Sequence, residues 1–109
     1  MKKAILETPY AGDTARNIEY AQKCMHDMLV NHNEAPYASH LLYTQPNVLD
    51  DDIKHERDLG IRAGFEWKHL DDVKTVFYTD LGMSHGMKLA LDYCRDNNLP
   101  YEFRRLNNV

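Results

Sequence analysis

The feature that most constrains this fold is the alternation along the chain of short, strand-like apolar stretches with longer stretches of helical periodicity. Strands that alternate with helices favour a parallel sheet that carries helices on both faces. The predicted strands, the second of them taken with its exit, cover residues 3–7, 36–40, 73–79 and 100–104.

Three helices are predicted between these strands, because apolar residues recur there at three- and four-residue steps. Asp13 is placed to cap the first helix and Asp52 to cap the second. Residues 41–52 contain Pro46 and three consecutive aspartates, and they are predicted to form a loop. The predicted helix faces consist of Ala15, Ile18, Ala21, Met25 and Met28, then Ile53, Glu56, Gly60, Ala63, Trp67 and Leu70, then Met87, Ala90, Leu91 and Cys94.

Right-handed crossovers limit this pattern to a flavodoxin-like three-layer sandwich with strand order 2-1-3-4. A single domain over residues 1–109 is expected from the chain length. The first and third strands are then neighbours, and ligands of such sheets bind at this switch point, outside the carboxyl ends of the strands. A binding site is therefore predicted where residues 9–13 meet residues 80–86, with Ser39 and His40 alongside.

The loop after the third strand contains Gly82-x-Ser84-x-Gly86 and leads into a helix. The first N–H groups of a helix are unpaired and its dipole is positive at that end, so this loop favours an anion such as a phosphate. The alternative is an ordinary turn in which Ser84 only caps the helix. The pattern is not a Walker motif. It fits the serine-nucleophile pattern literally, but no acid–histidine pair is placed to activate Ser84.

Polar residues of the other loops complete the predicted site. Tyr10 can stack on a base or bind a sugar, and Asp13 can bind hydroxyl groups, with a helix cap as its alternative role. His40 faces the site in this layout, with a structural role as its alternative, and His85 lies in the third loop. The predicted ligand-binding residues are Tyr10, Gly12, Asp13, His40, Gly82, Ser84, His85, Gly86 and Met87.

Charge and composition narrow the classes of partner. With 13 basic against 17 acidic residues, the chain has no basic footprint for nucleic acid. No stretch approaches the roughly 20 apolar residues of a membrane span, so a cytoplasmic protein without a membrane partner is expected. Neither a metal nor a cofactor is expected, and residues 50–52 are interpreted as a solvated loop with a helix cap. Cys24 and Cys94 are predicted to be buried free thiols.

The order of several short motifs resembles a known superfamily. Residues 8–13, followed by Asn17, resemble the opening of proteins related to nucleoside 2-deoxyribosyltransferases and nucleotide N-glycosidases. Residues 36–42 and the Asp50-Asp51-Asp52 run are similar to a small, often phage-borne branch of that superfamily. The resemblance extends from Ala4 to Phe103, and it also includes Glu56-Arg57, Gly60, Gly64 and Ser84-x-Gly86-Met87.

The resemblance implies a pocket for a sugar phosphate at the predicted switch point. Tyr10 and Gly12 would lie near the sugar or base, Ser84 and Gly86 would hold a phosphate, and His40 would line the pocket. Catalytic members carry a glutamate that acts at the anomeric carbon. Here the matching position is Ala90, and the catalytic residue is unknown. Asp92 lies about 200° around the helix from Ala90, so the candidate carboxylates are Asp13 and Asp80.

Three functions remain open from the sequence. The first is binding of a nucleotide, cyclic nucleotide or ADP-ribose-type molecule without efficient catalysis, with sequestration of that molecule as its role. The second is an N-glycosidase or deoxyribosyltransferase. The third is an oligomeric interaction module, with Trp67, Phe65 and Tyr43 at an interface. A homo-oligomer is expected in each case, because enzymes of the similar superfamily are usually oligomers.

Overall fold

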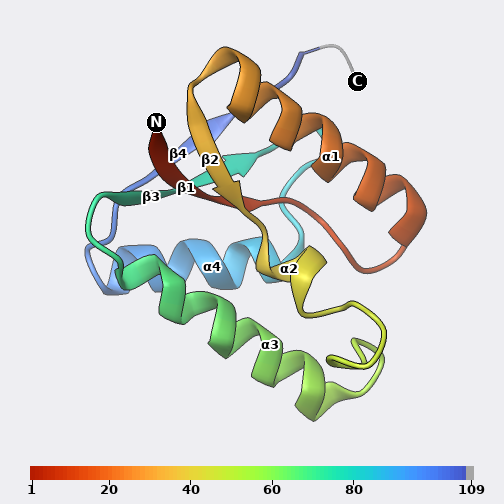
Figure 1. Ribbon diagram of the computed structural model, residues 1–109. Coiled ribbons are helices and arrows are strands. Elements are labelled where there is room, and N and C mark those ends of the chain that lie inside the picture. Colours follow the sequence, from red (N-terminus) through yellow and green to blue (C-terminus); the bar gives the residue numbers. More distant parts are fainter. Residues whose placement is uncertain (108–109) are drawn as a thin grey trace.

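A four-stranded parallel sheet forms the centre of the protein, in the strand order β2-β1-β3-β4 that was predicted. The computed structural model describes residues 1–107 (Figure 1). β1 and β3 are the central pair, so the switch point lies between them. The strands are β1 (Lys2–Glu7), β2 (Glu34–Tyr37), β3 (Val73–Tyr78) and β4 (Tyr101–Arg104).

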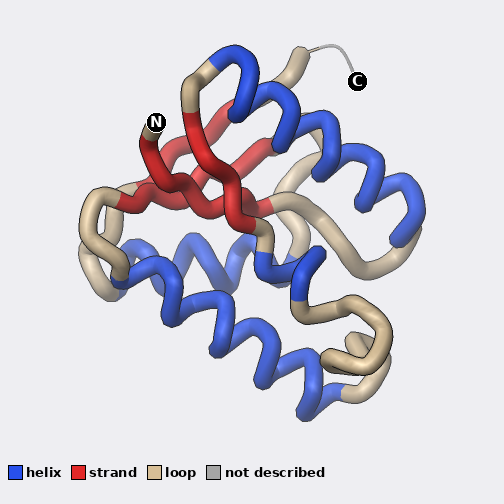
Figure 2. Tube along the Cα trace, viewed as in Figure 1, coloured by secondary structure: helices blue, strands red, loops and turns tan. Residues whose placement is uncertain are grey.

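Helices cover both faces of the sheet, as predicted (Figures 1 and 2). α1 lies on one face, and α3 and α4 lie on the other (Figure 1). Among residues 1–107, no helix combines the length and the apolar content that a membrane crossing requires. The helical segments are α1 (Thr14–Asn31), α2 (Ser39–Leu42), α3 (Lys54–Glu66), the 3₁₀ helix η1 (Trp67–His69) and α4 (His85–Asp96).

The core consists of two layers, because successive strand residues point to opposite faces of the sheet. On the α1 side, Leu6 and Val76 pack against Ala21 and other residues of that helix. On the other side, Phe77 packs against α4. Cys24 and Cys94 are buried free thiols, which confirms the prediction for both.

The inward face of α3 differs from the prediction. The helix ends at Glu66, and Trp67 and Leu70 of the predicted stripe are 43% and 47% exposed. The reason is close packing at two glycines. A Cβ atom at Gly64 would collide with the side chain of Ser39, and one at Gly60 would lie 3.2 Å from Leu49. These glycines let α2 and the loop after it approach α3. Gly60 belongs to the predicted stripe and the buried Gly64 does not, so only part of the predicted stripe faces inward.

Two helix starts also depart from the predictions. The cap position of α3 is Ile53, without a side-chain hydrogen bond, so Asp52 does not cap this helix. Ser39 and His40 form the first turn of α2, within a region predicted to be strand exit and loop. Asp13 does cap α1, and its carboxylate accepts a hydrogen bond from the Arg16 N–H.

The second strand begins at Glu34, two residues earlier than predicted. Glu34 is buried because Arg104 donates two hydrogen bonds to its carboxylate and Lys74 forms an ion pair with it. On α1, Asn17 and Tyr20 are buried, although the predicted face contained only apolar residues. Partners for these polar groups, which the sequence pattern does not reveal, make their burial possible.

Candidate functional site

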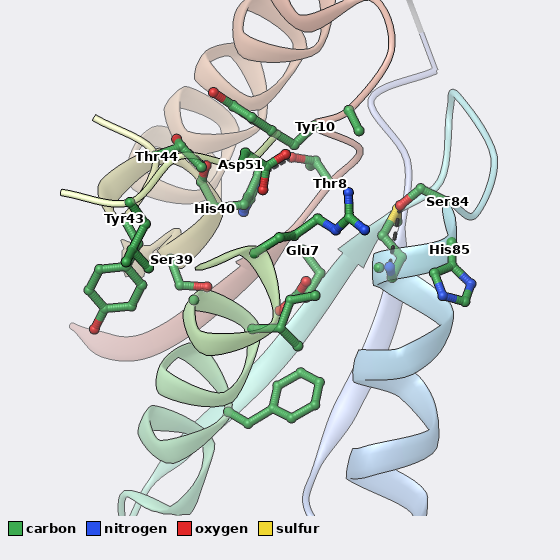
Figure 3. Close-up of a pocket in the computed structure, with 18 of the residues that line it drawn as sticks. Glu7, Thr8, Tyr10, Ser39, His40, Tyr43, Thr44, Asp51, Ser84 and His85 are labelled. Carbon is green, nitrogen blue, oxygen red and sulfur yellow. Dashed lines mark hydrogen bonds between the residues drawn. The ribbon is translucent and has the colours of Figure 1, made fainter. Parts of the chain in front are cut away.

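A cavity of about 470 Å³ opens at the carboxyl edge of the sheet, above the switch point. Its volume lies in the range of small-molecule sites, about 300–1,000 Å³. The segments after β1, β2 and β3 line it together with α3. Figure 3 shows Glu7, Thr8 and His40 on one side of this space and Ser84 and His85 at the start of α4 on the other.

The N-terminus of α4 forms one wall of the cavity. Residues 84–87 all line it. Ser84 is the cap, and its hydroxyl oxygen accepts a hydrogen bond from the Met87 N–H at 3.3 Å. Within residues 1–107, the N–H groups of His85 and Gly86 have no acceptor. These donors and the positive end of the helix dipole favour an anion at this wall.

Gly86 leaves the approach to this wall open. A Cβ atom at Gly86 would meet no atom within 4 Å, so nothing in the fold requires a glycine there. The space that a side chain would occupy instead lies beside the unpaired N–H groups. A ligand can therefore approach the backbone of α4 closely at Gly86.

His40 forms part of the opposite wall. Its Nε2 atom shares a hydrogen bond of 2.7 Å with the Thr8 hydroxyl, and its ring meets Tyr10 edge to face. The Nδ1 atom is buried and has no hydrogen-bond partner in the described part of the chain. Burial lowers the pKa of His40, although the Glu7 carboxylate opposes this shift, so the neutral imidazole is favoured.

Glu7 was not predicted as a site residue, and it lines the cavity at the end of β1. Its Oε1 atom lies 2.8 Å from the Lys68 ammonium, and the two side chains are 13% and 1% exposed. Lys68 Nζ also lies 3.5 Å from the Thr75 hydroxyl. In the sequence, the only indication of this role was a glutamate at the end of an apolar strand. A glutamate in that position is equally typical of a strand end that faces solvent.

A charged rim on the α3 side was also missed as part of the site. Asp51, Glu56 and Arg57 line the cavity, and Glu56 accepts a hydrogen bond from the Asp50 N–H at 3.0 Å. The resemblance contained these residues, but their distance in sequence from the predicted loops gave no reason to group them. The side chains of Tyr43, Thr44, Leu49, Ile61 and Phe65 complete this part of the lining.

Of the predicted ligand-binding residues, Tyr10, His40 and residues 84–87 line the cavity, whereas Gly12, Asp13 and Gly82 do not. Gly12 and Gly82 have φ angles of 99° and 86°, so they form the turns beside the site. Gly12 lines a neighbouring hollow with residues 44–52.

Asp80, a candidate catalytic carboxylate, lies outside the cavity lining. Tyr20 donates a hydrogen bond of 2.6 Å to its Oδ1 atom, and the N–H groups of Leu106 and Asn107 donate to the carboxylate. Burial would raise the pKa of Asp80, but these hydrogen bonds hold it below its usual value. Asp80 therefore anchors the chain after β4 to β3 and α1.

Ala90, the residue that the resemblance matches to the catalytic glutamate, is buried at 1% exposure. It packs with Phe77 and Met87 and does not line the cavity. Among residues 1–107, no group of three potential metal ligands comes together. The site therefore offers an anion wall, aromatic and imidazole surfaces, and a charged rim.

The family model described as Domain of unknown function (DUF7768) matches residues 2–104, so the chain belongs to this family. The match runs from the start of β1 to the end of β4, and every residue that lines the cavity falls within it. No curated protein and no solved structure matches the chain.

Proposed function

We propose that this member of the DUF7768 family binds a nucleotide-derived small molecule in the cavity without efficient catalysis. The observation that carries the proposal is that residues 84–87, Tyr10 and His40 line one cavity, with unpaired N–H groups at its α4 wall. An anion wall facing aromatic surfaces suits a ligand with a phosphate at one end and a planar base at the other.

The charged groups support one orientation of this ligand. The phosphate lies at Ser84 and Gly86, where the helix dipole is favourable, and Arg57 adds a guanidinium group on the facing helix. Tyr10 and His40 contact the sugar and base. The same cavity accommodates a nucleoside monophosphate, a cyclic nucleotide or part of an ADP-ribose-type molecule.

The proposed lack of efficient catalysis is supported by Ala90, a residue without a carboxylate that the resemblance matches to the family glutamate and that lies in the core. A tight binder that releases its ligand unchanged lowers the free concentration of that ligand. Sequestration of a nucleotide signal is therefore the physiological role that we propose, in the host cytoplasm if the chain is phage-encoded.

Isothermal titration with nucleoside monophosphates, cyclic nucleotides and ADP-ribose tests the binding. Arg57→Gln should weaken binding about tenfold or more, because hydrogen bonds to charged groups contribute about 1.5–3 kcal/mol. Arg62→Gln is the matched control, since Arg62 is an exposed arginine of the same helix that does not line the cavity. Folded protein that binds none of these compounds would contradict the proposal.

The second candidate function is an N-glycosidase or deoxyribosyltransferase. It is favoured by the acidic side chains of Glu7, Asp51 and Glu56 in the cavity wall, since carboxylates supply the nucleophile or the acid in glycosidic cleavage. Free base released from the same nucleotide panel, measured by chromatography, would support it. If no base appears over hours at high protein concentration, the enzymatic alternative is wrong.

We also propose that the protein assembles as a homo-oligomer through the outer face of α3 and η1. Leu59, Trp67 and Leu70 are exposed there, and the Trp67 ring is held by hydrogen bonding to Tyr43. Phe65 and Tyr43, which were also predicted at this interface, line the cavity. Sedimentation should show a species larger than one chain, and a monomer at micromolar concentration would contradict this assembly.

A further inference from the structure

We propose that Glu7 and His40 form a hydroxyl-binding subsite in the cavity, which gives the protein a preference for ribonucleotides over 2′-deoxyribonucleotides. This inference rests on the proposed function and names the class of sugar. Two polar residues line the cavity, and the fold leaves their hydrogen-bonding capacity partly unused.

The first group is the Glu7 carboxylate. Its Oε1 atom is paired with Lys68, which fixes the carboxylate in place. Its Oε2 atom has no donor within residues 1–107, and it is not sealed from solvent. A carboxylate held at a cavity wall by a buried ammonium group has lone pairs available for donors from a ligand.

The second group is the His40 imidazole. Its Nε2 atom is held by Thr8, whereas Nδ1 is buried without a partner in the described residues. An unpaired buried nitrogen is unfavourable, so a group that pairs with it gains more than one that replaces a water contact. Either tautomer leaves Nδ1 able to form one hydrogen bond, as a donor or as an acceptor.

A hydroxyl group has hydrogen-bonding chemistry that suits both groups. It donates to the Glu7 carboxylate and can donate to or accept from His40 Nδ1, whichever tautomer is present. A phosphate is disfavoured beside Glu7 by like charge and favoured at α4, so the sugar hydroxyls are left for this end of the cavity. Glu7 and His40 line the same cavity, and Thr8, the residue after Glu7, holds His40 Nε2 by a hydrogen bond, which supports one shared subsite.

The expected consequence is discrimination between sugars. A site that hydrogen-bonds a hydroxyl group rejects the analogue that lacks it, because its buried polar groups are then left unpaired. We expect ribonucleotides to bind about 10–100-fold more tightly than their 2′-deoxy counterparts, the range of one hydrogen bond to a charged group.

The test is isothermal titration of the four nucleoside 5′-monophosphates in ribo and 2′-deoxy forms. The wild-type protein is compared with Glu7→Gln/Lys68→Met, which removes the carboxylate without leaving an unpaired buried ammonium group. The double variant should bind both forms with the affinity that the wild type has for the deoxy form. His40→Phe/Thr8→Val, which removes the other half of the subsite with its partner, should reduce the preference in the same direction.

The outcomes separate this inference from the proposed function. Equal wild-type affinity for ribo and deoxy forms overturns the subsite and leaves nucleotide binding intact, and this measurement needs no variant. A ribose preference that survives unchanged in both double variants also overturns it. Failure of folded wild-type protein to bind any nucleotide overturns the proposed function, and this inference with it.

Discussion

Two polar clusters at the carboxyl edge of the sheet contain similar residues but differ in their roles. The anchor cluster, at the end of β3, consists of Asp80, Tyr20 and the N–H groups of Leu106 and Asn107. The floor cluster, at the end of β1, consists of Glu7, Thr8, His40 and Lys68. Each is built around a carboxylate that is largely removed from solvent.

The clusters differ in how completely their hydrogen bonds are formed. Both carboxylate oxygens of Asp80 accept hydrogen bonds from the protein. In the floor cluster, Glu7 Oε2 and His40 Nδ1 have no partner among residues 1–107. A cluster whose hydrogen bonds are all formed within the protein contributes only to stability. A cluster that lies beside a cavity and has unused donors or acceptors is able to bind a ligand.

The largest expected effect is that of Glu7→Gln alone. Lys68 has a side-chain exposure of 1%, and Glu7 is its ion-pair partner. Removal of one partner from a buried pair costs about 3–5 kcal/mol, because the other charge stays buried without compensation. Urea denaturation should show this decrease in the free energy of unfolding. Glu7→Gln/Lys68→Met should recover most of it, and a single variant as stable as the wild type would show that Lys68 is not held by Glu7.

Asp80→Asn should have the next largest effect on stability. The amide accepts hydrogen bonds less strongly than the carboxylate, and its NH₂ group cannot accept from Leu106 or Asn107. A decrease of about 1–3 kcal/mol in the free energy of unfolding is expected. Nucleotide affinity, measured by titration under conditions where the variant is folded, should not change. Loss of affinity in folded protein would place Asp80 in the site and remove the distinction between the clusters.

The pH dependence of stability should separate the clusters again, with a smaller effect. Burial lowers the pKa of His40 from 6.5, so the unfolded chain binds more protons than the folded protein below that pH. The free energy of unfolding should therefore decrease as the pH falls below 6.5. The pKa of Asp80 is lowered from 3.8 by its hydrogen bonds, so the contribution of the anchor cluster is lost only below that value.

His40→Phe/Thr8→Val is the control for this profile. It should abolish the His40 contribution between pH 6.5 and 4.5, above the values at which the glutamates with lowered pKa begin to titrate. At pH 7 it should be nearly neutral in stability, because both members of one hydrogen bond are replaced by apolar groups. An unchanged slope in this window would show that another group is responsible.

The difference between the clusters also explains what the sequence could predict. Periodicity and crossover handedness were sufficient for the strand order, and the switch-point rule then identified Tyr10, His40 and residues 84–87. These arguments depend on backbone direction, which short-range patterns encode. The role of Asp80 depends on where the chain runs after β4, and no local pattern encodes that.

In other parts of the protein, side-chain packing limited what could be predicted from the sequence. The inward face of α3 depends on the fit of Gly60 and Gly64 against residues distant in sequence, whereas the predicted stripe followed helical periodicity alone. Lys68 is buried because Glu7 is its ion-pair partner. From the sequence, each of these two residues by itself would be predicted to be an exposed charge. A sequence pattern thus located the cavity, and tertiary pairing decided which polar groups line it.

The smallest expected effect on stability is that of Gly86→Ala, at the α4 wall opposite the floor cluster. Nothing in the protein occupies the space of the new methyl group, and Ala is favoured over Gly in a helix by about 0.5–1 kcal/mol. Thermal unfolding should show a gain of this size or less, since the position is in the first turn. Gly82→Ala, at a φ of 86°, should instead lose stability.

If a phosphate approaches the backbone at Gly86, Gly86→Ala should also weaken nucleotide binding while the ribose preference persists. Unchanged affinity would show that the phosphate does not bind at α4. The floor cluster would then be the part of the cavity that recognises the ligand.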